Sequence, residues 1–308
     1  MSSESIIARG IVTAVERVSP AFVRVTFGGP ELADFGVPGG TFDQRIKLIF
    51  PAADGSLPPL AGSEDWYDDW LALPESARGS MRTYSIRSLH ASGEEPAVVI
   101  DFVLHLEPGL TGPASLWAAS ASAGAELLLI GPRRGAATEW GGVEYAPGAA
   151  RSVVLAGDET AAPAIARILE DSPDELRGVA FIEVPEAADA LPIAAPPGVR
   201  VAWLARDGLA QGEALTPQVL AHLGAATSAG DPRTQDAEVP DVVWETPTFS
   251  GSGEDVGDAA GQAERYFWIA GESRVVTTLR RHLVKDLGVD RSQVAFMGYW
   301  REGVAMRG

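Results

Sequence analysis

The first half of the chain consists of short segments in which apolar and polar residues alternate. Alternation with a period of two is typical of strands that bury one face, because successive side chains of a strand point to opposite sides. Proline, glycine and serine residues between the segments indicate turns. Short strands at this spacing predict an antiparallel barrel. The predicted strands are residues 6–17, 22–28, 44–50, 81–87, 97–104 and 126–130.

Between these strands the sequence predicts a loop and a helix. Residues 51–80 are rich in Pro, Gly, Asp and Ser, which favours a long loop with about one helical turn. Gly112 and Pro113 begin a predicted helix that runs to Ser122, since proline fits the first turn of a helix. Residues 135–150 are expected to link this half of the chain to the next.

The second half shows continuous apolar runs, as in parallel strands that are buried on both faces. The predicted strands are residues 153–156, 179–184, 199–204 and 266–270. A helix is predicted after the first of them, at residues 161–170, and another after Gly271-Glu272-Ser273, ending at Leu287. Strands that alternate with helices predict a doubly wound parallel sheet.

Residues 206–264 interrupt that pattern. A predicted helix near residues 217–224 is followed by an acidic stretch of Gly, Ser, Asp and Pro, densest over residues 228–261. We interpret this stretch as a flexible surface insertion, because such a composition cannot bury a core. The predicted domains are therefore a barrel over residues 1–147 and an α/β domain over residues 148–308 that contains the insertion.

Composition narrows the chemistry. The net charge of -18 argues against nucleic acid or an anionic membrane as a general partner, because both attract basic surfaces. The absence of cysteine excludes disulfides, thiolate nucleophiles and cysteine-ligated metal centres. No cationic segment precedes an apolar run at the start, and no apolar run reaches the ~20 residues of a membrane span. We expect a cytoplasmic protein without membrane insertion, whose redox role, if any, needs a non-covalent cofactor.

The predicted strand 81–87 combines an arginine, an aromatic ring and a serine. Arg82 and Tyr84 lie on one face, where a guanidinium can bind phosphate oxygens and a phenol ring can cover a flat heterocycle. Ser85 can bind a ring nitrogen. The segment resembles the Arg-x-Tyr-Ser/Thr signature of the flavin-binding barrel in the ferredoxin-reductase superfamily. Taken alone, the segment is better interpreted as an ordinary amphipathic strand with surface arginines, because short motifs match by chance.

A second segment suits a pyrophosphate. The glycine turn at Gly112 leads into a predicted helix, whose first N–H groups are free and lie at the positive end of the helix dipole. Ser115 adds a hydroxyl. The alternative is that Gly112-Pro113 only starts a helix. His105 stands alone, without ligand partners at metal-binding spacing, so we predict no metal site.

Six ordered segments together resemble the siderophore-interacting proteins, which are flavin-dependent ferric-siderophore reductases. The resemblance spans nearly all of the chain outside the 206–264 insertion. The segments are Arg82–Arg87, Asp101–His105, Gly112–Ala118, Gly131–Arg133, Ala156–Ile165 and the C-terminal pieces 271–273, 279–283 and 298–303.

The resemblance implies a Greek-key flavin-binding barrel followed by a nucleotide-binding sheet, as in ferredoxin reductases. It implies FAD as the cofactor, and NADH or NADPH as the electron donor. The implied FAD contacts are Arg82, Tyr84, Ser85, Asp101, Val103, His105, Gly112, Ala114 and Ser115. The implied nicotinamide contacts are Gly157, Asp158, Glu159, Thr160, Gly271, Glu272 and Trp300. Glu183, near the end of the second parallel strand, favours a free ribose hydroxyl and hence NADH.

The implied substrate is an anionic ferric siderophore, which needs local positive charge. Lys47 matches the family's strand lysine, and Arg133 or Arg134 its second basic position. Arg265 or Arg301 is the expected third. Lys47 is equally a solvated lysine on the outer face of a strand.

Two other functions remain open from the sequence. One is a general NAD(P)H:flavin or ferredoxin-type reductase with a protein electron partner, since one fold serves several partners. The other is a siderophore-binding protein without turnover. Electron transfer through a flavin asks for no nucleophile or general base in the protein.

Overall fold

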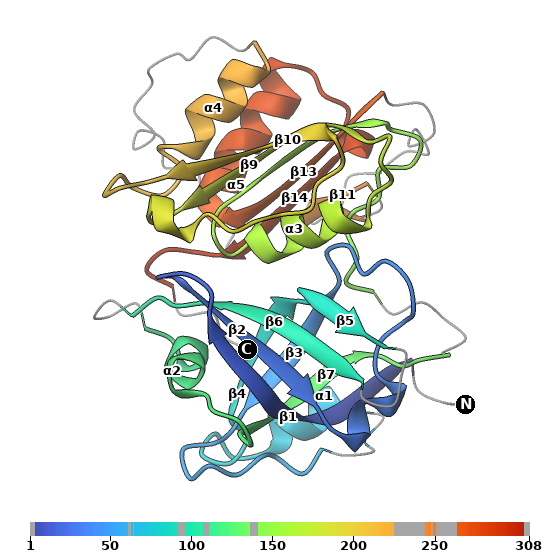
Figure 1. Ribbon diagram of the computed structural model, residues 1–308, viewed down its shortest axis with the longest axis vertical. Coiled ribbons are helices and arrows are strands. Elements are labelled where there is room, and N and C mark those ends of the chain that lie inside the picture. The colour runs from blue at the N-terminus through green and yellow to red at the C-terminus, as the bar shows by residue number, and fades with distance from the viewer. Residues whose placement is uncertain are drawn as a thin grey trace. The chain divides into compact units, whose positions relative to one another are not determined.

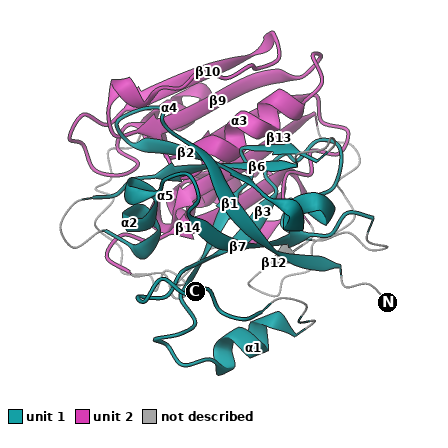
Figure 2. Cartoon of the chain, turned by 60° about the horizontal axis from the view of Figure 1, so that its bottom comes forward, with its two compact units in different colours: residues 1–143, 307–308 teal, residues 144–306 magenta. Residues whose placement is uncertain are grey.

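The structure is a computed structural model, and it describes residues 4–60, 63, 65–91, 96–106, 111–135, 141–224, 244–247, 249–250 and 264–304. Two compact units divide the chain, residues 1–143 and residues 144–306 (Figure 2). Most of the predicted acidic stretch at 228–261 lies outside the described residues. Within the described part, no helix combines the length and apolar character that crossing a membrane requires.

Unit 1 is an antiparallel sheet that curls into an open barrel, as the alternating pattern predicts (Figure 1). Its strand order is β4-β3-β7-β1-β2-β6-β5. Alternate residues of these strands face one interior cluster that includes Phe27, Leu48 and Phe102. The strands are β1 Ser5–Arg17, β2 Phe22–Gly28, β3 Arg45–Phe50, β4 Ser80–Ser85, β5 Ser88–His90, β6 Ala97–Val103 and β7 Glu126–Pro132.

Two helices and a short 3-10 turn, η1 Pro30–Asp34, complete unit 1. Helix α2, Pro113–Ser120, packs Ala114 and Ala118 into the barrel interior. Helix α1, Trp66–Ala72, lies inside the predicted loop and is longer than the single turn expected. The outer faces of β3, β4 and β7 are apolar there, so Trp70 is buried against Ile49 and Met81.

Unit 2 is a mixed sheet in the order β10-β9-β8-β13-β14-β11-β12. The first five strands are parallel, as predicted, and β11 and β12 form an antiparallel edge. The sequence pattern missed β11, β12 and β14. The strands are β8 Ser152–Gly157, β9 Arg177–Val184, β10 Gly198–Ala205, β11 Trp244–Thr246, β12 Phe249–Ser250, β13 Arg265–Glu272 and β14 Val294–Trp300.

Helices cover both faces of this sheet. Helices α4, Leu215–His222, and α5, Ser273–Arg280, pack on one face, and α3, Ala162–Asp171, lies on the other (Figure 1). The predicted helix to Leu287 changes character, because residues Arg281–Asp286 (η4) form a π-helix after α5. Short 3-10 turns are η2 Ala187–Asp189 and η5 Arg291–Gln293.

Candidate functional site

Strand β4 places Arg82 and Tyr84 on the interior face of the open barrel. They stand opposite Leu48 and Ile46 of β3, which belong to the interior cluster. Thr83 and Ser85 take the outer face, opposite Lys47 and Arg45. Because β4 ends the sheet, its interior residues border the opening towards β6. There the Tyr84 ring lies 4.7 Å, centroid to centroid, from that of Phe102.

Arg82 is a partly buried cation without a carboxylate partner in the described part of the chain. Its Nη1 donates only to the carbonyl oxygen of Met81, at 2.7 Å. Burial lowers the pKa of Arg82 and raises that of Tyr84, whose neutral hydroxyl is favoured despite the nearby positive charge of Arg82. A guanidinium in this state is stabilised by a phosphate, so the residue fits an anionic dinucleotide.

Asp101, an expected FAD contact, is engaged within the protein. Arg24 holds both carboxylate oxygens, with Nε–Oδ1 2.7 Å and Nη2–Oδ2 2.8 Å, and Arg87 Nε lies 3.7 Å from Oδ2. The carboxylate is nearly fully buried. Its visible task is to hold Arg24 and Arg87 beside the strand ends, because a bidentate pair fixes the geometry of both partners.

The start of α2 is tied to the end of β6. The Ser115 hydroxyl donates to the Val103 carbonyl at 3.2 Å and accepts from the His105 N–H at 3.3 Å. Gly112 is the N-cap residue, and a Cβ built on it would meet nothing within 4 Å. The first N–H groups of a helix have no partner within the helix, so those of α2 are candidates to bind a pyrophosphate. The structure brings Val103, His105, Gly112, Ala114 and Ser115 together.

Lys47 and Arg45 are successive outward residues of β3. Lys47 Nζ donates to Thr83 Oγ1 at 2.8 Å, and burial, then the charge of Arg45, lowers the pKa of Lys47. Ile130 of β7 lies opposite Lys47, and Arg133 and Arg134 follow the end of β7. Within the described residues, the buried Nε and Nη2 of Arg134 have no hydrogen-bond partner. Sequence reasoning missed Arg45, although the period of two places it on the Lys47 face.

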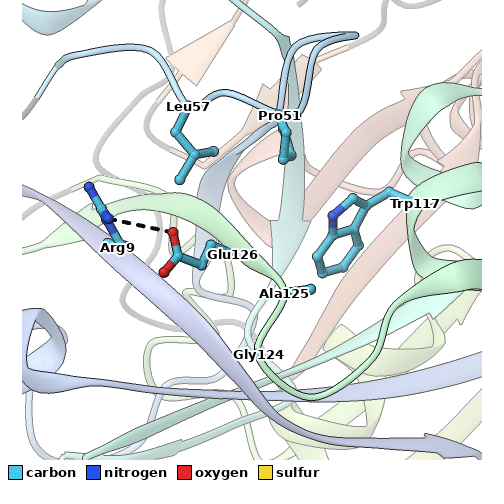
Figure 3. A pocket seen from close by; sticks show the side chains of 8 residues that line it. Arg9, Pro51, Leu57, Trp117, Gly124, Ala125 and Glu126 are labelled. Carbon is cyan, nitrogen blue, oxygen red and sulfur yellow. Dashed lines mark hydrogen bonds and ion pairs between the residues drawn. The ribbon is translucent and has the colours of Figure 1, made fainter.

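A pocket of about 470 Å³ in unit 1 is lined by none of the predicted site residues (Figure 3). Leu57, Pro51 and the Trp117 ring face it from one side, and Arg9 and Glu126 from the other (Figure 3). Arg9 Nη1 and Glu126 Oε2 form an exposed ion pair at 3.5 Å, so the wall offers little net charge to an anionic substrate.

In unit 2, Asp158 joins the carboxyl ends of three parallel strands. Its Oδ1 accepts from the Thr160 N–H and hydroxyl, at 2.9 and 2.5 Å. Its Oδ2 accepts from the Glu272 N–H at 2.7 Å and from Trp300 Nε1 at 2.9 Å. The turn after β8 and the ends of β13 and β14 therefore meet at one buried carboxylate, which brings these predicted nicotinamide residues together.

Glycine is required where the strands approach Asp158. Gly271 has φ 136°, and a Cβ there would lie 2.6 Å from Asp158 Oδ2. A Cβ on Gly157 would lie 2.7 Å from the Ala270 carbonyl oxygen. Burial, and then the charge of Glu159, raises the pKa of Asp158 to about 6. The hydrogen bonds from Thr160 and Trp300 oppose that rise.

Glu159 and Glu183 are buried carboxylates that share one arginine. Arg206, directly after β10, binds Glu159 through Nη1–Oε2 at 2.7 Å and Nη2–Oε1 at 2.9 Å, and lies 3.4 Å from Glu183. Glu183 also accepts from the backbone N–H groups of Gly212, Ala214 and Leu215, at 2.8, 3.0 and 3.0 Å. Its oxygens hold the start of α4, so the expected preference for a ribose hydroxyl has no support. Arg206 was missed, although it ends a parallel strand.

The remaining predicted residues divide between two edges of the sheet. Glu272 caps α5, since its Oε2 accepts from the N–H groups of Arg274 and Val275 at 2.7 and 3.1 Å. Trp300 ends β14, so Arg301 follows at the same carboxyl edge. Arg265 is the first residue of β13 and therefore lies at the opposite, amino edge. The structure does not bring Arg265 together with the nicotinamide residues.

Comparison with known proteins decides the family. The profile of the siderophore-interacting FAD-binding domain matches residues 11–136, and the siderophore-interacting protein profile matches residues 150–303. The chain belongs to the siderophore-interacting protein family. An uncharacterised protein of Mycobacterium tuberculosis is 35% identical, over 95% of this chain and 89% of its own.

Two relatives have names that describe an activity. The ferric vibriobactin reductase of Vibrio cholerae is 28% identical, over 93% of this chain and 86% of its own. The NADPH-dependent ferric-chelate reductase of Escherichia coli is 27% identical, over 94% of this chain and 91% of its own.

Solved structures share the fold. A siderophore utilization protein from T. fusca has a TM-score of 0.67 and 28% identity, over 99% of this chain and 96% of that one. A ferredoxin NADP+ reductase from Neisseria gonorrhoeae, with bound FAD and NADP, has a TM-score of 0.53 and 15% identity, over 97% of this chain and 100% of that one. The second likeness concerns the fold alone, and it confirms the ferredoxin-reductase-like class predicted from sequence.

Proposed function

We propose that this protein is an FAD-dependent reductase that transfers electrons from NAD(P)H to the iron of ferric siderophores and releases Fe(II) in the cytoplasm. The observation that carries the proposal is the partly buried Arg82, which has no carboxylate partner among the described residues and stands beside Tyr84 at the opening of a barrel that matches an FAD-binding profile. The names of the Vibrio cholerae and Escherichia coli relatives support the ferric substrate.

Residues of unit 1 would hold the cofactor. Arg82 binds phosphate oxygens, Tyr84 covers the ring system, and the first N–H groups of α2 bind the pyrophosphate. Val103 and His105 complete the set, whereas Ser85 lies on the outer face of β4, away from Arg82 and Tyr84. Bound FAD supplies the conversion between two-electron transfer from NAD(P)H and one-electron reduction of Fe(III). The protein's task is to bind and orient, so no side chain serves as a nucleophile or general base.

The carboxyl edge of unit 2 would hold the nicotinamide nucleotide. Ligands of such sheets bind outside the carboxyl ends of the strands. The turn Gly157–Thr160 and the end of β13 offer backbone groups there, while Asp158 fixes the Trp300 indole through its Nε1. Glu159 and Glu183 bind protein groups, so choice between NADH and NADPH lies with other residues.

The ferric siderophore would bind through cations. Lys47 is held by Thr83 and is partly desolvated, and Arg134 has buried donors that find no partner in the part of the chain that the structure describes. Both features favour an anionic ligand, because a desolvated cation gains more from a counter-charge than a solvated one. Arg133 and Arg301 are further candidates. Fe(II) binds hard oxygen ligands less strongly than Fe(III), so reduction releases the iron.

The test is a reductase assay with the reconstituted protein. Purified protein is incubated with FAD, and its visible spectrum is recorded after gel filtration. NADH, NADPH or a reduced ferredoxin is then added with a ferric catecholate siderophore and a chromogenic Fe(II) chelator. We expect bound flavin and Fe(II) formation with a reduced nicotinamide nucleotide.

The other outcomes identify the alternatives. Absence of bound flavin would refute the proposal. Flavin reduction without Fe(II) formation would identify a general flavin or ferredoxin-type reductase. Siderophore binding without turnover would identify a carrier protein. A faster reaction with reduced ferredoxin than with either nucleotide would make ferredoxin the electron donor.

A further inference from the structure

The amino edge of the unit 2 sheet, opposite the proposed nicotinamide site, gathers arginines. Arg265 is the first residue of β13 and Arg177 the first of β9. Ser152 of β8 pairs in register with both, so Arg177, Ser152 and Arg265 form a row across three adjacent strands. Arg200 of β10 extends the row, in register with Val179 two residues beyond Arg177.

These side chains share the sheet face that α4 and α5 cover. Val154, Val179 and Phe267 stand two residues after Ser152, Arg177 and Arg265, and all three pack in the cluster beneath those helices. Alternation therefore puts the side chains of the row on that same face. A Cβ on Gly198 would lie 3.0 Å from Arg177 Cγ, which agrees with a common face for Arg177 and Arg200.

His222, at the end of α4, stands over the row. Its ring centroid lies 5.7 Å from that of Phe181, and Arg200 Cζ lies 5.3 Å from the same ring. Burial, and then the positive charges of Arg265 and Arg200, lowers the pKa of His222. His222, Arg265 and Arg200 are therefore close enough to interact electrostatically. The negative end of the short α4 dipole offsets part of their repulsion.

None of the three guanidinium groups has a hydrogen bond or an ion pair among the described residues. Other arginines of unit 2 behave differently, since Arg167, Arg206 and Arg280 each bind a carboxylate. Asp174, Glu175 and Glu264 are near in sequence, yet form no such pair. In a chain of net charge -18, three cations that have no partner among the described residues and lie on one sheet edge mark a place where an anion would be stabilised.

We propose that Arg177, Arg200, Arg265, Ser152 and His222 form a binding site for a small polyvalent oxyanion, a diphosphate or a tricarboxylate. Neighbouring strands lie about 4.8 Å apart, so the Cα atoms of Arg177 and Arg265 are about 10 Å apart across β8. A single phosphate is too small to contact both fully, and a larger oxyanion reaches both while the Ser152 hydroxyl donates to it. This site is independent of the proposed reductase activity.

The experiment is calorimetric titration of the FAD-loaded protein at low ionic strength, with inorganic pyrophosphate in one arm and citrate in the other. We expect saturable binding that Arg177→Gln and Arg265→Gln each weaken about tenfold, the loss of one charge-assisted contact. Ser152→Ala weakens it a few-fold. Tighter binding of pyrophosphate assigns a phosphorylated ligand, and tighter binding of citrate a polycarboxylate.

Arg151→Gln is the matched control. Arg151 precedes Ser152 at the same edge, so alternation directs its exposed side chain to the other face, and the variant loses the same charge. It should change the dissociation constant less than twofold. Absence of saturable binding to the wild-type protein, or equal weakening by Arg151→Gln and Arg265→Gln, would overturn the site. Melting temperatures of the variants within a few degrees of wild type identify correct folding, and Ser152→Ala tests the site where an arginine variant fails to fold.

Discussion

The interior face of β4 and the carboxyl edge of the unit 2 sheet both carry charged side chains, but they use them differently. On β4, Arg82 is partly buried and, among the described residues, donates only to a neighbouring carbonyl. At the carboxyl edge, Asp158, Glu159 and Glu183 are buried, and each binds several protein donors. A cation without a protein partner is available to bind a ligand. A carboxylate that already accepts hydrogen bonds from the protein instead fixes the position of the backbone that would contact the ligand. Whether a charged side chain contacts a ligand can therefore be judged only once its hydrogen-bond and ion-pair partners within the protein are known.

Asp158→Ala should have the largest effect, because it removes the acceptor that holds the carboxyl edge of the unit 2 sheet together. It leaves the donors of Thr160, Glu272 and Trp300 without their acceptor, and we expect the free energy of unfolding to fall by about 2–4 kcal/mol. The KM for the nicotinamide nucleotide should rise as well. Urea unfolding and steady-state kinetics measure the two effects. Asp174→Ala, which removes an exposed carboxylate from the same unit, should cost less than about 0.5 kcal/mol.

Arg82→Gln tests whether the charge on β4 serves ligand binding and not stability of the fold. Loss of one charge-assisted phosphate contact should weaken FAD binding by about 10–100-fold, with little change in apoprotein stability, because no protein ion pair is lost. Flavin fluorescence titration gives the dissociation constant. Arg281→Gln removes an exposed charge of unit 2 and should leave it unchanged. A large loss of apoprotein stability in Arg82→Gln would show that Arg82 is structural.

Lys47→Met should have a smaller effect, confined to the substrate. We expect kcat/KM for an anionic ferric catecholate to fall about tenfold, from the loss of one cationic contact, while the KM for the nucleotide stays constant. A neutral ferric chelate should be affected less. Lys285→Met, an exposed lysine of unit 2, is the control. Equal losses for charged and neutral chelates would remove Lys47 from the substrate site.

The smallest effect concerns pH. The pKa of Asp158 is raised from 3.8 to about 6, mainly by burial, so the folded state holds a proton that the unfolded state has released. The contribution of Asp158 to stability therefore decreases as pH rises through that interval and stays low above it. The difference in unfolding free energy between wild type and Asp158→Asn, measured from pH 4 to 8, should decline and then level off. A difference that grows with pH would contradict the raised pKa.

Much of the fold follows from periodicity. The alternating strands of unit 1 and the apolar runs of unit 2 fall where the pattern predicts, because period-two burial and burial on both faces are local signals. The motif segments likewise indicated FAD and the family. The short strands β5 and β11 were not predicted, since few residues of each are buried, and β12 has only two residues. Helix α1 is longer than the single turn predicted, because its apolar residues are buried against the outer face of the barrel, which the sequence pattern does not show.

The hydrogen-bond and ion-pair partners of the charged residues, in contrast, were shown only by the tertiary structure. The sequence shows Asp158 and Glu183 near strand ends and Asp101 within a strand, but it does not show that each carboxylate is buried against donors far along the chain. It also offered Arg265 and Arg301 as equivalent, although the strand direction puts them at opposite edges of one sheet. The physical reason is that residue type and spacing follow from the chain itself. Whether a charge is paired, and at which end of a strand it emerges, depends on contacts between segments that only folding brings together.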